Sequence, residues 1–279
     1  MKKAFQMIGI ITLTFFSFFI TEKTVLVVND LDDIMIQIKS NKDKYKGNYI
    51  DAYIEGNTII PGMNGKVVNV NKSYKNMKLN GYYSDRLFVY DYTTPNISLY
   101  DNLDKYIIKG NSNKRMVSLV FIVKGDEDIT DILSIINNYN IKVTFFIDYI
   151  WYENNNDLVK TIIDKGHTIS IYMDNYTDSD FEWLDMVVKK INKQSTNFCY
   201  ILDDREDELD ICSSKGDYTI RPVIISDKTP LVDIKNKIES GSILSLTINS
   251  ELKRELPTII IYIKSKGYKL ANLEEHILE

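Results

Sequence analysis

The sequence predicts an α/β protein whose main domain is a distorted (β/α) barrel of seven strands. Residues 110–279 alternate between short runs rich in β-branched and aromatic residues and longer runs with apolar residues at helical spacing. Strands that alternate with helices in this way form parallel sheets with right-handed crossovers. Before this domain, we expect a signal anchor or transmembrane segment at residues 1–23 and a small α+β module at residues 24–109.

The pattern is clearest between residues 116 and 176, where strands are expected at 117–123, 141–148 and 167–173. The first intervening helix begins behind a predicted cap at Asp128, and Gly166 ends the second. Later strands are expected at residues 197–201, 217–225, 242–248 and 269–271. The remaining helices are expected at residues 179–194, 206–214, 230–238 and 252–266.

The segment between residues 24 and 109 has a different residue pattern from the main domain. Gly and Asn turn signals are frequent, and short extended runs occur at residues 58–60, 66–70 and 87–90, after a helical piece at residues 30–40. This pattern predicts a small α+β module made mostly of strands and loops.

The N-terminus carries Lys2 and Lys3, followed by an apolar run over residues 4–20. The run is long for a signal-peptide core and lacks a small-x-small cleavage site, which favours an uncleaved signal anchor over a cleaved signal. With the positive charges on the cytoplasmic side, the protein would be a single-pass protein of the cell membrane with its C-terminal domain outside the cytoplasm.

Charge and cysteine content bear on the partners and on a possible disulfide. The formal net charge of -5 argues against a nucleic-acid partner, because an acidic protein is not expected to present a basic face that displaces counterions from phosphates. Cys199 and Cys212 could form a disulfide outside the cell, or they could be two small buried apolar residues. Their spacing matches no zinc motif.

Three stretches of the main domain resemble the polysaccharide deacetylase family, the NodB homology domain of carbohydrate esterase family 4. Residues 120–124 read VFIVK where the family has T-F-D-D-G, residues 142–146 read KVTFF where it has K-A-T-F-F, and GHTISIY at residues 166–172 follows its G-H-E-I-G frame. The resemblance extends from residue 115 to the C-terminus and implies a NodB-like barrel.

In that family a divalent metal is held by one aspartate and two histidines. By position these ligands fall on Val123, Tyr172 and Tyr176. A metal lowers the pKa of its bound water to near neutrality, and this chemistry requires side chains with available lone pairs. A valine has none, and a phenol with a pKa of about 10 is a weak zinc ligand. The resemblance therefore implies no cofactor, and a divalent metal such as zinc only if other residues hold it.

The family's proton-transfer positions are also changed. The catalytic base, the arginine and the late histidine fall on Ile122, Cys199 and Thr247, so the resemblance predicts no catalytic residues. Other side chains on the loops after the strands are candidates for a groove that binds a ligand: Asp126, Asp148, Trp151, Tyr172, Asp174, Tyr176 and Asn249.

Each of these candidates also has a structural interpretation. The acids could converge as oxygen ligands or could be solvated loop residues, and Trp151 could stack on a sugar or cover the core. Of the two histidines, His167 is expected to be structural and His276 to lie on the surface.

These observations lead to three hypotheses about function. The first is a membrane-anchored, extracytoplasmic pseudoenzyme that binds cell-wall glycan, such as peptidoglycan, or an envelope protein. The second is an active metal-dependent carbohydrate or peptidoglycan N-deacetylase with a non-standard site. The third is a structural interaction protein without glycan affinity.

Overall fold

The computed structural model describes residues 11–17, 30–173, 178–194, 197–203 and 205–279. The described residues form two compact units, one from residues up to 49 together with 64–94, the other from residues 50–63 together with 95–279. This division differs from the predicted boundary after residue 109. Residues 50–63 and 95–109 belong to the larger unit because their strands pair with its sheet.

The smaller unit packs two helices and a two-stranded antiparallel sheet around a small core. Its elements are α2 (Asp33–Asn41), η1 (Lys42–Tyr45), β3 (Gly65–Val68), α3 (Val70–Asn80), η2 (Asp85–Leu87) and β4 (Tyr90–Thr93). Asp32 caps α2, and Gly81 ends α3 with a left-handed φ of 79°. Ile38, Met77 and Phe88 fill the core. Helix α3 was not predicted, because its run contains few apolar residues.

The larger unit contains one curled sheet. In chain order its strands are β1 (Tyr53–Glu55), β2 (Thr58–Ile60), β5 (Tyr106–Ile107), β6 (Met116–Val123), β7 (Thr144–Ile147), β8 (Thr168–Tyr172), β9 (Phe198–Tyr200), β10 (Tyr218–Ile220), β11 (Val223–Ile224), β12 (Ile243–Thr247) and β13 (Lys269–Leu270). The sheet order is β1-β2-β5-β10-β9-β8-β7-β6-β12-β11, with β13 also paired to β6. Only the β1–β2 pair in this sheet is antiparallel.

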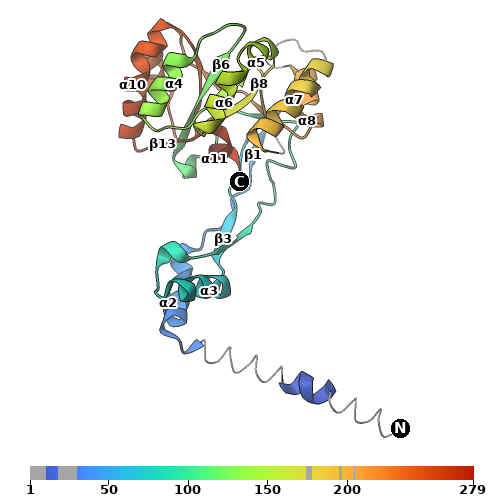
Figure 1. Cartoon of the computed structure of the whole chain (residues 1–279), viewed down its shortest axis with the longest axis vertical. Coiled ribbons are helices and arrows are strands. Elements are labelled where there is room, and N and C mark those ends of the chain that lie inside the picture. Colours follow the sequence, from blue (N-terminus) through green and yellow to red (C-terminus); the bar gives the residue numbers. More distant parts are fainter. Residues whose placement is uncertain (1–10, 18–29, 174–177, 195–196, 204) are drawn as a thin grey trace, which may run out of the picture. The chain divides into compact units, whose positions relative to one another are not determined.

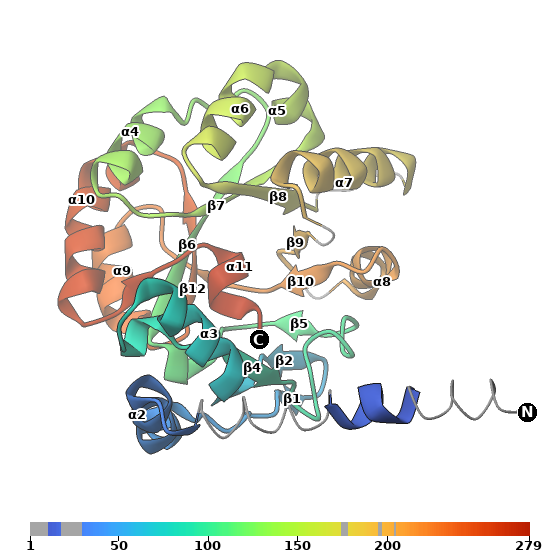
Figure 2. The same ribbon diagram turned by 60° about the horizontal axis from the view of Figure 1, so that its bottom comes forward.

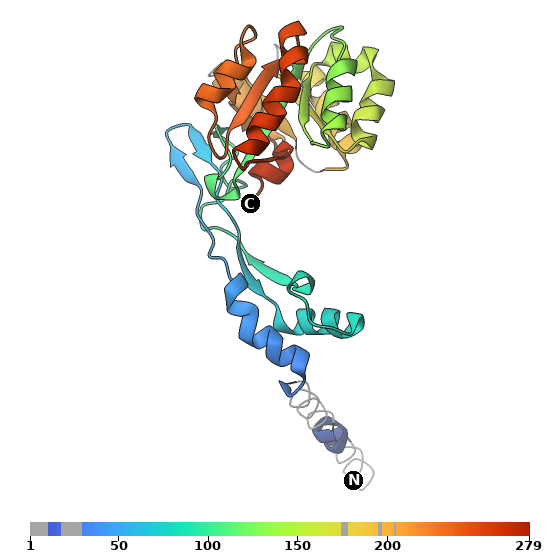
Figure 3. The same ribbon diagram turned by 90° about the vertical axis from the view of Figure 1, so that its left-hand side faces the viewer.

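The sheet is a curled half-barrel rather than the closed seven-stranded barrel that the sequence predicts. The expected strand at residues 217–225 is broken at Arg221 and Pro222 into β10, which pairs with β9 and β5, and β11, which pairs with β12. Proline has no N–H to continue a ladder. The free edge of β10 is taken by β5, and the β1–β2 hairpin, light blue in Figure 3, extends that edge.

Helices cover the outside of the curled sheet (Figures 1 and 2). They are α4 (Thr130–Asn138), α5 (Tyr149–Asn154), α6 (Asn156–Asp164), α7 (Asp178–Asn192), α8 (Glu206–Ser214), α9 (Pro230–Lys237) and α10 (Ser250–Ser265). Two further short helices are η3 (Ser112–Lys114) and α11 (Leu273–Ile277). The predicted helices are confirmed within a few residues, whereas α5 and α11 were not predicted.

The central strands β6, β7, β8 and β9 are buried on both faces, as expected for a parallel sheet covered by helices. On β6, Leu119 and Phe121 belong to the core between sheet and helices, whereas Val120 belongs to the core inside the curl. The inner core also holds Phe146 and Tyr200. This alternation decides which side chains of each strand point into the curl.

Within the described residues, no helix is long and apolar enough to cross a membrane. Most of the predicted anchor, residues 1–10 and 18–23, lies outside the described ranges.

Both histidines are buried and structural. His167 is 2% exposed, and its Nδ1 accepts a hydrogen bond from the Val143 N–H at 3.4 Å. The expectation that His276 lies on the surface is wrong, because α11 carries it into the interior, where its Nδ1 is 2.9 Å from Ser118 Oγ. Burial, aided by a nearby lysine in each case, lowers the pKa of each imidazole to about 4.

These lowered pKa values predict that acid destabilises the fold. The folded state favours the neutral imidazole, so the stabilisation is complete above the unfolded pKa of about 6.5 and is lost as pH falls towards 4. We expect His276→Asn, which keeps a hydrogen-bonding group towards Ser118, to remove about 3 kcal/mol of the change in unfolding free energy between pH 7 and pH 4. Urea denaturation at each pH measures this, and equal pH dependence in both proteins would contradict it.

Candidate functional site

The C-terminal ends of β6, β7, β8, β9 and β12 meet at one end of the curled sheet, which we call the rim. Strand register places Ile122 of β6 beside Thr247 of β12 and beside Phe146 of β7. On the other side of β7, Tyr172 of β8 pairs with Tyr200 of β9. Function sits at this end of parallel (β/α) barrels. The rim thus brings together three of the positions carried over from the resemblance, namely Ile122, Thr247 and Tyr172.

The side chains at the end of β6 offer no lone pairs to the rim. Ile122 packs against the inner core, and Val123 is fully buried in the core between sheet and helices. Val123 therefore points away from the interior of the curl. Neither position presents a metal ligand or a base at the rim.

Lys124 extends the inward-facing series of β6 and reaches Tyr172. Its Nζ donates a hydrogen bond to the Tyr172 hydroxyl at 2.9 Å and lies 4.1 Å from the centroid of the same ring. A cation over an aromatic face at this distance is attracted by about 0.5 to 2 kcal/mol. The Lys124 ammonium thus contacts Tyr172, the residue that aligns with a metal-binding histidine of the family.

Aromatic side chains fill the interior below this pair. The rings of Tyr172 and Tyr200 have centroids 5.5 Å apart, and Tyr200 contacts Phe146 at 5.4 Å. The Tyr200 hydroxyl lies 3.0 Å from Ser245 Oγ, and burial raises the pKa of this phenol. Tyr172 itself is only 4% exposed. Both phenol rings are therefore packed against other aromatic side chains.

The described donors do not fit a divalent metal at the rim. Val123 has no lone pair, and the Tyr172 oxygen already accepts from an ammonium that would repel a second cation. Tyr176 and Asp174 lie outside the described residues.

Two of the candidate acids and amides cap helices. Asp148 accepts from the Trp151 N–H at 2.7 Å at the start of α5, and also from the Gly125 N–H at 3.0 Å. Asn249 accepts from the Leu252 N–H at 2.7 Å at the start of α10. Asp128 accepts from the Thr130 N–H at 2.9 Å, but the N-cap residue of α4 is Ile129, which makes no side-chain capping bond, so Asp128 lies one residue before the observed cap position. These hydrogen bonds give Asp148 and Asn249 a structural role at the starts of helices.

Trp151 cannot stack on a sugar, so this part of the groove prediction is corrected. Its side chain is 0% exposed, and its Nε1 donates to the Glu127 carbonyl at 2.9 Å. Together with Asp148, it ties the loop after β6 to α5. Asp126 on the same loop is exposed.

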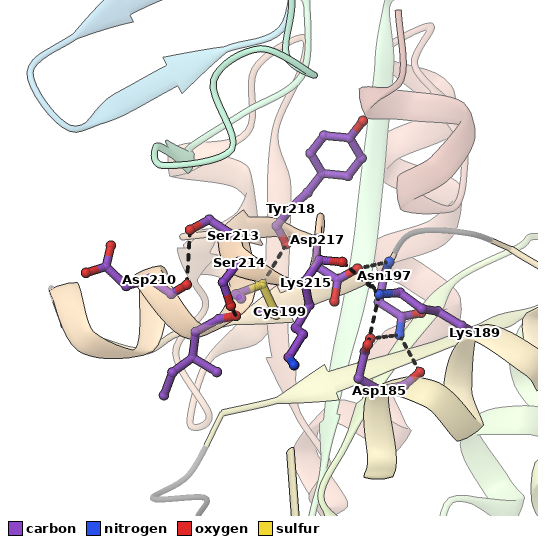
Figure 4. Close-up of a disulfide and its surroundings, with 12 residues drawn as sticks. Asp185, Lys189, Asn197, Cys199, Asp210, Ser213, Ser214, Lys215, Asp217 and Tyr218 are labelled. Carbon is purple, nitrogen blue, oxygen red and sulfur yellow. Dashed lines mark hydrogen bonds and ion pairs between the residues drawn. A yellow bond between two sulfur atoms is a disulfide. The ribbon is translucent and has the colours of Figure 1, made fainter. Parts of the chain in front are cut away.

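Cys199 and Cys212 form a disulfide between β9 and α8, with Cα atoms 6.4 Å apart. Figure 4 shows a buried polar cluster beside it, in which Lys189 pairs with Asp185 at 2.8 Å and with Asp217 at 2.9 Å. Burial raises the pKa of the Asp217 carboxyl to about 7. In the part of the chain that the structure describes, Cys199, Cys212 and Asp217 form the one cluster whose ligand atoms are close enough for a metal, and the disulfide removes both thiolates from it.

Two residues, Lys124 and Trp183, are not among the candidates that the sequence predicts. Lys124 follows Val120 and Ile122 at the same strand parity, a signal that could have placed it inside the curl. Trp183 lies off the predicted apolar face of its helix, and 39% of it remains exposed. Trp151, in contrast, is fully buried.

Comparisons with known proteins agree with this geometry. Residues 109–205 match the sequence profile of the polysaccharide deacetylase family. The uncharacterized protein YlxY of Bacillus subtilis (strain 168) is 27% identical over 236 residues, which are 77% of this chain and 74% of that protein.

Among solved structures, a carbohydrate esterase family 4 pseudoenzyme from Bacillus anthracis is 23% identical and superposes with a TM-score of 0.64, covering 88% of this chain and 95% of that one. A mutant of it, described as having restored enzymatic activity, gives a TM-score of 0.65. A peptidoglycan N-acetylglucosamine deacetylase is 18% identical, with a TM-score of 0.54 over 62% of this chain and 92% of that one. At these identities the likeness shows the fold.

The disulfide predicts a measurable stabilisation. It closes a short loop, with a sequence separation of 13, and cross-links of this length typically add about 3 kcal/mol by restricting the unfolded chain. We expect Cys199→Ala with Cys212→Ala to lower the unfolding free energy by about this amount in urea denaturation. A reducing agent should then affect only the wild type. Equal midpoints for wild type with and without reductant would contradict the expectation.

Proposed function

We propose that this chain, which matches the polysaccharide deacetylase family over residues 109–205, is a catalytically inactive member of that family that binds cell-wall glycan. The observation that carries the proposal is the Lys124 ammonium on the Tyr172 phenol, since it puts a fixed positive charge where the family's chemistry requires a metal. Ile122 and Thr247 at the same rim supply neither a base nor an imidazole acid.

Glycan is the ligand class that the relatives support. Similar folds include a peptidoglycan N-acetylglucosamine deacetylase and a chitin deacetylase, whose substrates are both chains of amino sugars. Catalysis and binding use different groups, because recognition of a sugar chain needs stacking and hydrogen-bonding side chains but no metal. Loss of the reaction is therefore compatible with retained binding.

We also propose that the larger unit acts outside the cytoplasm, tethered by the N-terminal apolar run. The support is the sequence, with Lys2 and Lys3 before residues 4–20, and the disulfide, since such bonds persist in oxidising compartments.

The proposal is tested on the purified full-length chain with insoluble peptidoglycan. We expect the protein to sediment with the glycan and to release no acetate from it or from chitooligosaccharide after incubation with zinc, cobalt or manganese. The reason is that, of the described residues, Ile122 and Val123 offer no ligand or base and the Lys124 ammonium repels a cation. Metal-dependent acetate release would favour an active hydrolase with a non-standard site. Failure to sediment would favour an interaction protein without glycan affinity.

The role of Lys124 predicts how metal binding would return. The double variant Tyr172→His with Tyr176→His supplies two imidazoles but keeps the ammonium, so we expect weak zinc binding. Adding Lys124→Asp replaces a repelling charge with a ligand and should tighten zinc binding by at least roughly tenfold in equilibrium dialysis.

The matched control adds Lys160→Asp to the same double variant. Lys160 is an exposed lysine on α6, so the net charge changes equally but away from the rim. It should bind zinc like the double variant. Equal affinity in all three proteins would show that Lys124 does not exclude the ion.

A further inference from the structure

The sequence has two tryptophans, and only Trp183 is open to solvent among them. Trp151 is fully buried, whereas Trp183 on α7 remains 39% exposed. Its ring meets Tyr149 at a centroid distance of 5.4 Å and Tyr152 at 5.5 Å, with interplanar angles of 72° and 76°. These edge-to-face contacts with α5 restrict the indole to one orientation, so little entropy is lost when a ligand packs on it.

A groove runs along α7 next to this indole. It has a volume of about 520 Å³ and is lined by Ser179, Glu182, Trp183, Asp185, Met186 and Lys215. A second groove of about 310 Å³ between α7 and α8 shares Glu182 and Lys215 with the first. Together they form a continuous surface of a size that suits small-molecule and oligosaccharide ligands.

The chemistry of this surface combines a flat apolar wall with charged hydrogen-bonding groups. Lys215 and Glu182 form an ion pair on the groove wall, and their side chains are 35% and 64% exposed. A pyranose ring has the matching character, with an apolar face of C–H groups and a rim of hydroxyl and amide groups. A lipid surface would instead have to desolvate this ion pair without compensation.

The site flanks the rim. Tyr149 directly follows Asp148 at the C-terminal end of β7, and α7 is the helix that follows β8. We propose that Trp183, supported by Tyr149 and Tyr152, is the stacking platform of a glycan-binding groove on α7 and α8, outside the former catalytic positions. This inference rests on the proposed glycan binding and names the surface responsible for it.

Tryptophan fluorescence tests the proposal on the full-length chain with chitotetraose as the probe. Because Trp151 is buried, a sugar on the platform should change the emission of Trp183 alone. We expect a saturable change in wild type and none in Trp183→Phe. In sedimentation with insoluble peptidoglycan, affinity should fall at least tenfold in Trp183→Ala and less in Trp183→Phe, which keeps an aromatic face.

Tyr100→Ala serves as a matched control, since Tyr100 is a 69% exposed aromatic residue of the same unit that does not line either groove. It should bind glycan like wild type, and thermal melts should confirm that each variant is folded. Wild-type binding that survives in folded Trp183→Ala would overturn the platform and leave the proposed function intact. Absence of binding by wild type itself would overturn both.

Discussion

The contact between the Lys124 ammonium and the Tyr172 phenol limits what the rim of the curled sheet can bind. A hydrogen bond of 2.9 Å and a ring distance of 4.1 Å hold a positive charge at the rim of the curled sheet. The phenol is nearly buried, so its oxygen has one good partner and little access to others. A divalent ion at this place would have to displace the lysine and then bind to a phenol oxygen, which is a weak zinc ligand, and both steps are unfavourable.

The fold produces this contact through simple alternation. Successive side chains of β6 face opposite sides, so Val120 and Ile122 enter the curl and Val123 faces the helices. Lys124 continues the inward series just as the strand ends. Phe146, Tyr172 and Tyr200 fill the interior beneath it with aromatic rings. Packing thus maintains the curled sheet, while Ile122 and Val123 present no metal ligand at the end of β6 and Lys124 places an ammonium there.

The parts of the fold that the sequence could predict were those set by local periodicity. The alternation of strands and helices from β6 onwards depends on neighbouring residues only. The pairing of β2 with β5 and of β5 with β10 joins segments far apart in the chain, and no local pattern encodes it. The break at Pro222, by contrast, was visible in the sequence but was outweighed there by the apolar residues around it.

The site divides in the same way. The absence of the family's ligands at Val123 and Tyr172 could be read from the sequence, whereas the identity of the group that replaces the ion required the geometry of Lys124. The exposure of the two tryptophans could not be predicted from the sequence. It depends on which face of each helix packs against the sheet, and the spacing of residues around Trp151 allowed either outcome. His276 was misplaced for a related reason, since α11 was not expected and its packing brings the imidazole against Ser118.

The most direct test is a crystal of the full-length chain soaked in zinc, with anomalous scattering recorded at the zinc edge. We expect Lys124 Nζ to stay on the Tyr172 ring and no anomalous peak to lie within bonding distance of the Tyr172 hydroxyl. A zinc ion seated at the rim among protein side chains would contradict it.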